Sequence, residues 1–172
     1  MFNPQSIINK LESNSKEFQL VLSGLSKEEY LWKPKPEKWC ALEVVCHLHD
    51  EEREDFRERV KLVLDSPETP FRKIDPVAWV AERKYMEQDF EFMLSQFLAE
   101  RAETVKWLRG LKEPWWDNAY IHPKVGPVTA RLLLTNWLAH DYLHFRQILK
   151  LKYGFLKADS GEKLDYAGDV WE

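Results

Sequence analysis

The sequence contains little cysteine and little glycine. Only six of its 172 residues are glycine, which is few for a fold built from tight turns and short strands. Its two cysteines, Cys40 and Cys46, fall on different faces of one expected helix, where a disulfide is geometrically unfavourable. We expect both to be buried free thiols in a reducing compartment. The composition therefore favours helices and excludes a disulfide-stabilised scaffold.

Basic residues and long apolar runs are also scarce. The net charge is −4, the isoelectric point is near 5.8, and charges of both signs are interspersed, so the chain has no basic footprint for nucleic acid. No apolar run reaches the ~18 residues of a membrane-spanning helix. The first residues also lack the basic-then-apolar pattern of a secretory leader. We expect a cytoplasmic protein that binds neither nucleic acid nor membrane.

Apolar residues recur at three- and four-residue spacing in four long segments. Asn3-Pro4 and Asp75-Pro76 each combine a capping residue with a proline suited to a first helical turn. The pattern predicts helices over about 3–24, 41–64, 75–109 and 128–154, with room for a bend at 85–89.

The segments outside these helices are predicted to be irregular. Residues 111–127 contain three prolines and form a crossover before the last helix, and residues 155–172 form a tail that packs back over the bundle. No repeat, low-complexity tract or linker divides the chain, so we expect residues 1–172 to form one domain. The fold class predicted is all-α, a four-helix bundle with a long crossover before the last helix.

Three histidines carry the clearest chemistry in the chain. His140 and His144 lie one helical turn apart and therefore on one helix face, and His47 belongs to the helix predicted over 41–64. If these helices pack together, three neutral imidazoles could bind one divalent metal and leave a coordination position open. The alternative is that they are core histidines satisfied by hydrogen bonds. No glutamate stands three residues before any histidine, so a di-iron bundle is excluded and one metal is expected.

Several polar residues near these histidines are secondary candidates. Glu51 lies one turn after His47 and could accept a hydrogen bond from a metal-bound water or carry a proton. The alternative for Glu51 and Asp50 is a solvated or salt-bridged carboxylate. Asn136 and Gln147 are candidates for contact with the histidine ligands.

The two remaining histidines are weaker candidates. His49 projects nearly opposite to His47 and is expected at the surface or in an interface. His122 lies in the crossover, where its distance from the site cannot be inferred. Aromatic residues of the same crossover, Trp115, Trp116 and Tyr120, are candidates for a pocket wall, and core or dimer packing would account for them equally well.

The histidines and their surroundings resemble the DinB/YfiT-like superfamily. The resemblance rests on the run from Trp39 through His47 to Glu51 and on His140-xxx-His144-xx-Gln147, and it extends to the aromatic tail 164–171. It implies a four-helix bundle with one metal near an end, held by His47 from the second helix and by His140 and His144 from the fourth.

The resemblance also implies a function. Family relatives include metal-dependent transferases that use low-molecular-weight thiols, so we expect an enzyme that joins such a thiol to a small electrophile. The alternatives are a metal-dependent hydrolase and a non-catalytic stress-response binding module with a structural metal. Zinc or nickel is the expected ion, with iron or manganese also compatible. Eight tryptophans make a homodimer a further expectation.

Overall fold

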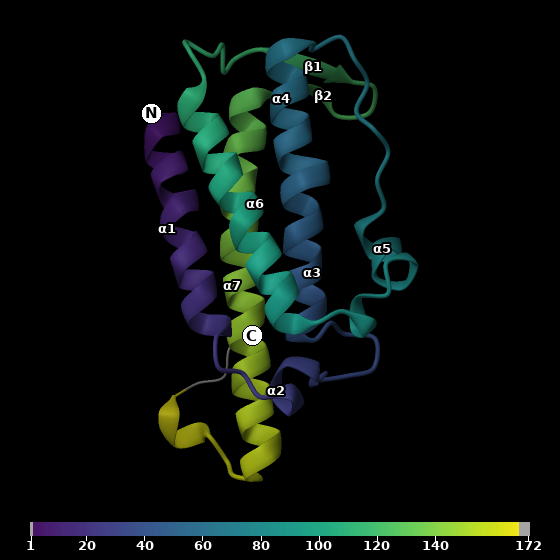
Figure 1. Ribbon diagram of the computed structural model, residues 1–172, viewed down its shortest axis with the longest axis vertical. Helices are drawn as coiled ribbons and strands as arrows, with labels where there is room; N and C mark the ends of the chain where they lie inside the picture. Colours follow the sequence, from purple (N-terminus) through teal and green to yellow (C-terminus); the bar gives the residue numbers. More distant parts are fainter. Residues whose placement is uncertain (1, 169–172) are drawn as a thin grey trace.

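The computed structural model describes residues 2–168, and these residues are mostly helical (Figure 1). The elements in chain order are α1 (Pro4–Leu22), α2 (Lys27–Leu31), α3 (Ala41–Glu51), the π-helical turn η1 (Glu52–Phe56), α4 (Arg57–Asp65), α5 (Pro76–Glu82), the 3-10 turn η2 (Tyr85–Glu87), α6 (Phe90–Gly110), β1 (Ala119–His122), β2 (Gly126–Thr129), α7 (Ala130–Ser160) and the 3-10 turn η3 (Asp165–Ala167). The predicted fold class, a four-helix bundle, is confirmed.

Four long rods run side by side in Figure 1: α1, α3 continued by η1 and α4, α6, and α7. The main contacts of α1 are with α6 and α7, whereas α3 packs on α6 and α4 packs on α7. Each rod therefore has two principal neighbours, and rods that follow one another in sequence are not always neighbours in space. The connections after α1 and after α6 cross the two ends of the bundle (Figure 1).

The predicted helix starts at Asn3-Pro4 and Asp75-Pro76 are both confirmed. The Asn3 side chain accepts a hydrogen bond from the Ser6 backbone N–H at 3.0 Å, and Asp75 accepts one from Ala78 at 3.1 Å. These bonds satisfy backbone donors that a first helical turn leaves without an intrahelical partner.

The prediction of one helix over residues 75–109 is wrong. Helix α5 ends at Glu82, Lys84 adopts a left-handed conformation with φ 51°, and α6 begins at Phe90 after an Asp89 cap. The break falls where a bend had been allowed. Its physical reason is tertiary, because the buried Tyr85 turns inward and its hydroxyl donates a 2.6 Å hydrogen bond to Asp50 of α3.

The crossover is more regular than its sequence predicts. Strands β1 and β2 form an antiparallel hairpin in which Ala119 pairs with Thr129 and His122 with Gly126. The Asn118 side chain donates a 2.8 Å hydrogen bond to the Val63 carbonyl and so fixes the hairpin to the end of α4. Thr129 then caps α7 by accepting a hydrogen bond from Leu132.

The last helix continues beyond the predicted end near Gly154 and runs to Ser160. Gly154 lies inside α7, and its lack of a side chain leaves room for the indole of Trp32 beside the helix. A Cβ at this position would stand 2.6 Å from the Trp32 ring, closer than packing allows. Glycine here serves close packing and does not end the helix. Of the predicted tail, Trp171 lies outside the described residues.

Two apolar clusters fill the bundle, one toward each end. Phe18, Phe97 and Ile148 belong to the first, and Leu11, Val105 and Trp137 belong to the second. Every rod contributes to both clusters, and buried polar residues lie between the two along each rod. This polar layer consists of Asn14, His47, Glu52, Arg101, Thr104, Asp141 and His144. Within residues 2–168, no helix is both long and apolar enough to cross a membrane.

Candidate metal centre

His47, His140 and His144 meet at one point in the polar layer. The Nε2 atom of His140 lies 3.3 Å from Nε2 of His47 and 3.0 Å from Nε2 of His144. The ligand atoms of all three side chains lie within 4.8 Å of one another. The structure therefore brings together, from two distant segments, the three histidines that the sequence predicts as a group.

Helix packing places these side chains. His140 and His144 share one face of α7, and the buried residues Trp137, Asp141 and Ile148 hold that helix against the rest of the bundle. Helix α3 contacts α7, and its buried face carries His47. Two aromatic rings pack beside the histidines: the Trp39 ring lies 4.8 Å from the His47 ring, and the Phe56 ring lies 5.0 Å from the His140 ring.

Burial keeps the three imidazoles neutral. It lowers the pKa of His47 to about 3 and that of His140 to about 2, and in both cases a neighbouring imidazole lowers the pKa further. The pKa of His144 is also lowered by burial, although its hydrogen bond to Gln147 acts in the opposite direction. Near neutral pH all three rings therefore have an unprotonated nitrogen available to bind a metal.

The donor atoms fit a single metal ion. Tetrahedral ligation at about 2.0–2.1 Å places neighbouring nitrogens roughly 3.3 Å apart, close to the two separations between Nε2 atoms. Metal binding through Nε2 requires the proton of His144 to be on Nδ1. That proton has an acceptor, because Nδ1 lies 2.8 Å from the Gln147 side-chain oxygen. A proton on Nδ1 leaves the Nε2 lone pair directed at His140 and His47. The Nδ1 atom of His47 is buried without a hydrogen-bond partner among the described residues.

A buried ionic network lies next to the histidines. Arg101 donates two hydrogen bonds to the Asp141 carboxylate, each 2.8 Å long, and a third to Glu52 at 2.8 Å. Glu52 also accepts from the indole of Trp137, and Asp141 accepts from the Asn14 amide. Burial alone would lower the pKa of Arg101, but the charges of Glu52 and Asp141 raise it and keep the guanidinium charged. The network joins all four rods at the level of the site.

The sequence pattern does not predict this network, although it places charged residues on two apolar helix faces. Arg101 lies on the apolar stripe of α6 between Phe97 and Val105, and Asp141 lies on the stripe of α7 one turn after Trp137. A charged residue on an otherwise apolar helix face indicates a buried ion pair. Glu52 begins the π-helical turn, a local irregularity that is common at functional sites.

Comparisons with known proteins identify the family to which this chain belongs. The family model of the DinB superfamily matches residues 10–148, which is most of the chain and includes all three histidines. The chain belongs to the DinB superfamily. No curated protein sequence gives a significant match.

A solved structure supports the same fold for this DinB-superfamily protein. YfiT from Bacillus subtilis matches with a TM-score of 0.77 over 93% of this chain and 89% of the YfiT chain, at 19% sequence identity. That protein is described as a probable metal-dependent hydrolase with an unusual four-helix bundle topology. At this identity the match establishes the shared fold, and YfiT's activity is not transferred by it.

The prediction that His49 lies at the surface or in an interface is not supported, because its side chain is buried in this DinB-superfamily chain. Its Nδ1 lies 3.1 Å from the Asp50 carboxylate, which also accepts from Tyr85 and pairs with Arg83 at 2.9 Å. Burial would raise the pKa of Asp50, but the hydrogen bonds from His49 and Tyr85 and the Arg83 charge lower it. Asp50 thus anchors the segment after α5 to α3. Helical spacing alone predicted an exposed His49, because it does not show which other segments pack on a helix.

Glu51 is buried one turn after His47, and its carboxyl group faces Asp55. Burial, followed by repulsion from Asp55 and a hydrogen bond with it, raises the pKa of Glu51 to about 8. Burial raises the pKa of Asp55 as well, although Arg59, which pairs with Asp55 at 2.6 Å, acts in the opposite direction. Glu51 can therefore gain or lose a proton near neutral pH, and its catalytic role stays a prediction.

The weaker candidates divide into one that reaches the histidines and two with other contacts. Gln147 contacts His144, as expected. Asn136 is exposed and its amide donates to the Leu132 carbonyl in its own helix. His122 belongs to β1, where its Nδ1 accepts a hydrogen bond from the Lys124 backbone. The histidine group found among the described residues does not include His122.

The crossover aromatics and the cysteines lie in other environments. Trp116 and Tyr120 pack on the second apolar cluster, whereas Trp115 is 71% exposed. Burial raises the pKa of Cys40 to about 11 and that of Cys46 to about 12, so both remain protonated thiols. The expectation of buried free thiols is confirmed.

Proposed function

We propose that this DinB-superfamily protein is a divalent-metal-dependent enzyme that joins a low-molecular-weight thiol to a small electrophile. The observation that carries the proposal is the convergence of three neutral imidazoles, with the Nε2 atom of His140 3.3 Å from that of His47 and 3.0 Å from that of His144. His47, His140 and His144 hold the ion in this proposal. Zinc or nickel suits such a ligand set, and iron or manganese is compatible with it.

The ligand set determines what chemistry an ion would supply. A divalent ion with three neutral ligands acts as a Lewis acid that favours the deprotonated form of a thiol or a water molecule. The thiol comes from a cosubstrate, because the pKa of Cys40 and Cys46 lies at about 11 and 12 and both side chains are buried. Such thiols are kept reduced in the cytoplasm, where we place the protein.

Glu51 is the proposed proton carrier. Its pKa of about 8 lets it accept the proton that a nucleophile releases and pass it on at neutral pH. Burial is the main cause of this raised pKa, Asp55 raises it further, and Arg59 lowers it. Gln147 orients the His144 ring, and the Arg101–Asp141 ion pair fixes the segment of α7 that carries both histidines.

Metal-dependent hydrolysis is the second candidate. It is supported by the description of YfiT as a probable metal-dependent hydrolase and by the availability of Glu51 as an acid–base group. The two functions differ in the nucleophile and share the same three histidines. In both, the substrate is a small molecule.

The test begins with metal content and proceeds to reaction type. Purified protein should hold about one ion per chain, and His140→Ala should abolish retention, while His122→Ala, a substitution outside the group, should leave it intact. Metal-loaded protein should then consume a small thiol in the presence of 1-chloro-2,4-dinitrobenzene. Thiol-independent cleavage of 4-nitrophenyl acetate, without thiol consumption, would favour the hydrolase. Equal metal retention by wild type and His140→Ala would overturn both functions.

A further inference from the structure

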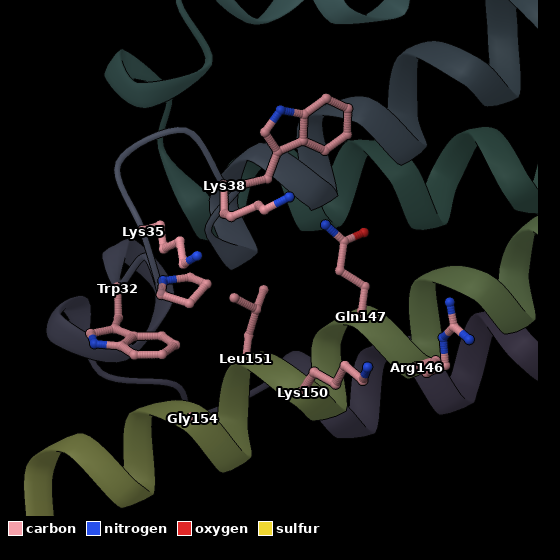
Figure 2. Close-up of a pocket in the computed structure, with 10 residues that line it drawn as sticks. Trp32, Lys35, Lys38, Arg146, Gln147, Lys150, Leu151 and Gly154 are labelled. Atoms are coloured by element: carbon pink, nitrogen blue, oxygen red, sulfur yellow. The ribbon is translucent and has the colours of Figure 1, made fainter. Parts of the chain in front are cut away.

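A pocket of about 480 Å³ opens beside the candidate metal centre. Figure 2 shows that one wall is formed by α7, which contributes Gln147 and Leu151, and that the facing wall comes from the segment containing Trp32 and Lys38. This volume falls within the range of small-molecule binding sites. None of the proposed roles above uses the pocket.

The pocket has an aromatic, apolar wall. Trp32, Trp39 and Leu151 line it, so flat apolar surface is available to a ligand. Gly154 of α7 leaves room for the Trp32 indole, since a Cβ at this position would stand 2.6 Å from the ring. A preformed wall of this kind favours a planar apolar group.

The rim of the pocket is cationic. Lys35, Lys38, Arg146 and Lys150 line it, and none of the ten described residues around the pocket is acidic. This contrasts with the net charge of −4 of the whole chain. In Figure 2 these side chains surround the opening on both sides, from α7 and from the facing segment. A local positive field in a cleft attracts anions and raises their concentration at the site.

Two residues link the pocket to the histidines. Trp39 lines the pocket and its ring lies 4.8 Å from that of His47, while Gln147 lines it and contacts His144 Nδ1 at 2.8 Å. A molecule in the pocket therefore lies one side chain away from two of the three histidines. A substrate held in the pocket could therefore extend its reactive end to the metal site.

We propose that the pocket binds the substrate of the metal centre, a small molecule with a planar apolar body and a carboxylate or phosphate group. The indole wall takes the planar body, and the lysine and arginine side chains at the rim take the anionic group. The assignment to a substrate rests on the proposed function, whereas the binding selectivity does not. Lys35, Lys38 and Trp32 are the specificity-determining residues in this assignment.

The experiment measures binding to metal-free protein, so that it does not depend on catalysis. The probes are 2-naphthoate, 2-naphthyl phosphate and neutral 2-naphthamide, titrated calorimetrically at low ionic strength. We expect both anions to bind about tenfold or more tightly than the amide, with affinity falling as salt is added. A tighter naphthyl phosphate would assign a phosphate ligand, and a tighter naphthoate a carboxylate.

Variants test which residues are responsible. Lys35→Gln/Lys38→Gln should weaken anion binding about tenfold and leave amide binding unchanged. Lys10→Gln/Lys61→Gln, which removes the same charge from exposed positions outside the pocket, should retain wild-type binding. Trp32→Ala should weaken all three probes, with circular dichroism to verify the fold.

The outcome is separable from that of the proposed function. His140→Ala should lose the metal and keep the preference for anions. If the amide binds as well as the two anions, if no probe binds, or if both double variants weaken binding equally, the pocket assignment is overturned, whatever the metal content. Failure of the wild-type protein to bind a metal, with intact anion selectivity, would instead reject the enzyme proposal and leave a plain anion-binding pocket.

Discussion

The side-chain oxygen of Gln147 lies 2.8 Å from Nδ1 of His144, and the same residue lines the pocket beside the metal centre. One residue of α7 thus connects a histidine of the metal group with the space in which we place the substrate. Its position, three residues after His144, makes the contact possible within a single helical turn.

Loss of the Gln147 contact should weaken metal binding. Gln147→Ala removes the acceptor that fixes the His144 tautomer, and we expect metal affinity to fall about tenfold or more. Competition with a chromogenic chelator measures the change. Asn136→Ala, which removes an exposed amide of the same helix, is the matched control. Unchanged affinity in Gln147→Ala would show that the hydrogen bond does not orient a metal ligand.

Metal binding should stabilise the fold. An ion that binds only the native state at 100 times its Kd adds about 2.7 kcal/mol to the free energy of unfolding. For a domain of this size the Tm should rise by roughly 5–10 °C. Differential scanning calorimetry with zinc and with a chelator measures this shift. His140→Ala should abolish it and His122→Ala should retain it, so an equal shift in both variants would place the ion elsewhere.

Stability of the metal-free protein should fall in mild acid. The pKa of His140 is lowered from an ordinary value of 6.5 to about 2, so below pH 6.5 the unfolded chain binds the proton that the native state refuses. Above pH 6.5 both states leave His140 neutral, so the free energy of unfolding is not reduced. At pH 5 protonation of His140 in the unfolded chain lowers the free energy of unfolding by about 2 kcal/mol. Urea unfolding at pH 7.5 and 5 measures the loss. His140→Gln should show a smaller decrease, and an identical decrease would argue against a buried neutral imidazole.

Ionisation of Glu51 should lower the stability of the native protein as the pH rises toward 8. Its pKa is raised to about 8, so the native state holds a proton that the unfolded chain releases above about pH 4.5. This contribution is complete below pH 4.5 and is lost as the pH rises to 8. Glu51→Gln should therefore gain stability relative to wild type at pH 8.5, by an amount on the order of 1–3 kcal/mol, and less at pH 5.

The same substitution tests catalysis by Glu51. If Glu51 carries a proton, Glu51→Gln should lower kcat about a hundredfold and remove the ionisation near pH 8 from the rate profile of metal-loaded protein. Asp55→Asn should keep the activity and move that ionisation to lower pH, because it removes the repulsion from Asp55. A rate profile that is the same in all three proteins would exclude Glu51 from proton transfer.

Arg101 should be the most sensitive charged residue for stability. Arg101→Met leaves Asp141 and Glu52 buried without their cation, and the expected loss is about 3–5 kcal/mol. Arg109→Met breaks an exposed, solvent-screened pair with Glu12 and should destabilise the protein far less. Chemical denaturation of both variants measures the contrast. Similar losses in the two would mean that the buried network does not stabilise the native state.

Sequence patterns correctly predicted the helix starts that depend only on neighbouring residues. The cap and proline at Asn3-Pro4 and at Asp75-Pro76 set helix starts that the structure confirms, because a cap depends only on neighbouring backbone groups. The spacing of His140 and His144 likewise places both on one face of a helix. The meeting of these two with His47 was predicted from spacing together with family resemblance.

Long-range contacts explain what the sequence did not predict. The break before α6 depends on Tyr85 reaching Asp50, and the continuation of α7 through Gly154 depends on the packing of Trp32. His49 proved buried, and the Asp50 carboxylate beside it is held by Tyr85 from the segment after α5. Helical spacing cannot show such contacts, since it describes each helix in isolation.

The sequence by itself determined the bundle, its caps and the histidine pair on the last long helix, because helical periodicity and capping act over a few residues. Only the tertiary structure decided that Arg101 lies between Glu52 and Asp141, and that a cationic, tryptophan-walled pocket adjoins the histidines. These features bring together side chains from segments far apart in the chain. Their energies depend on burial and on charge pairing, which arise only when the helices pack.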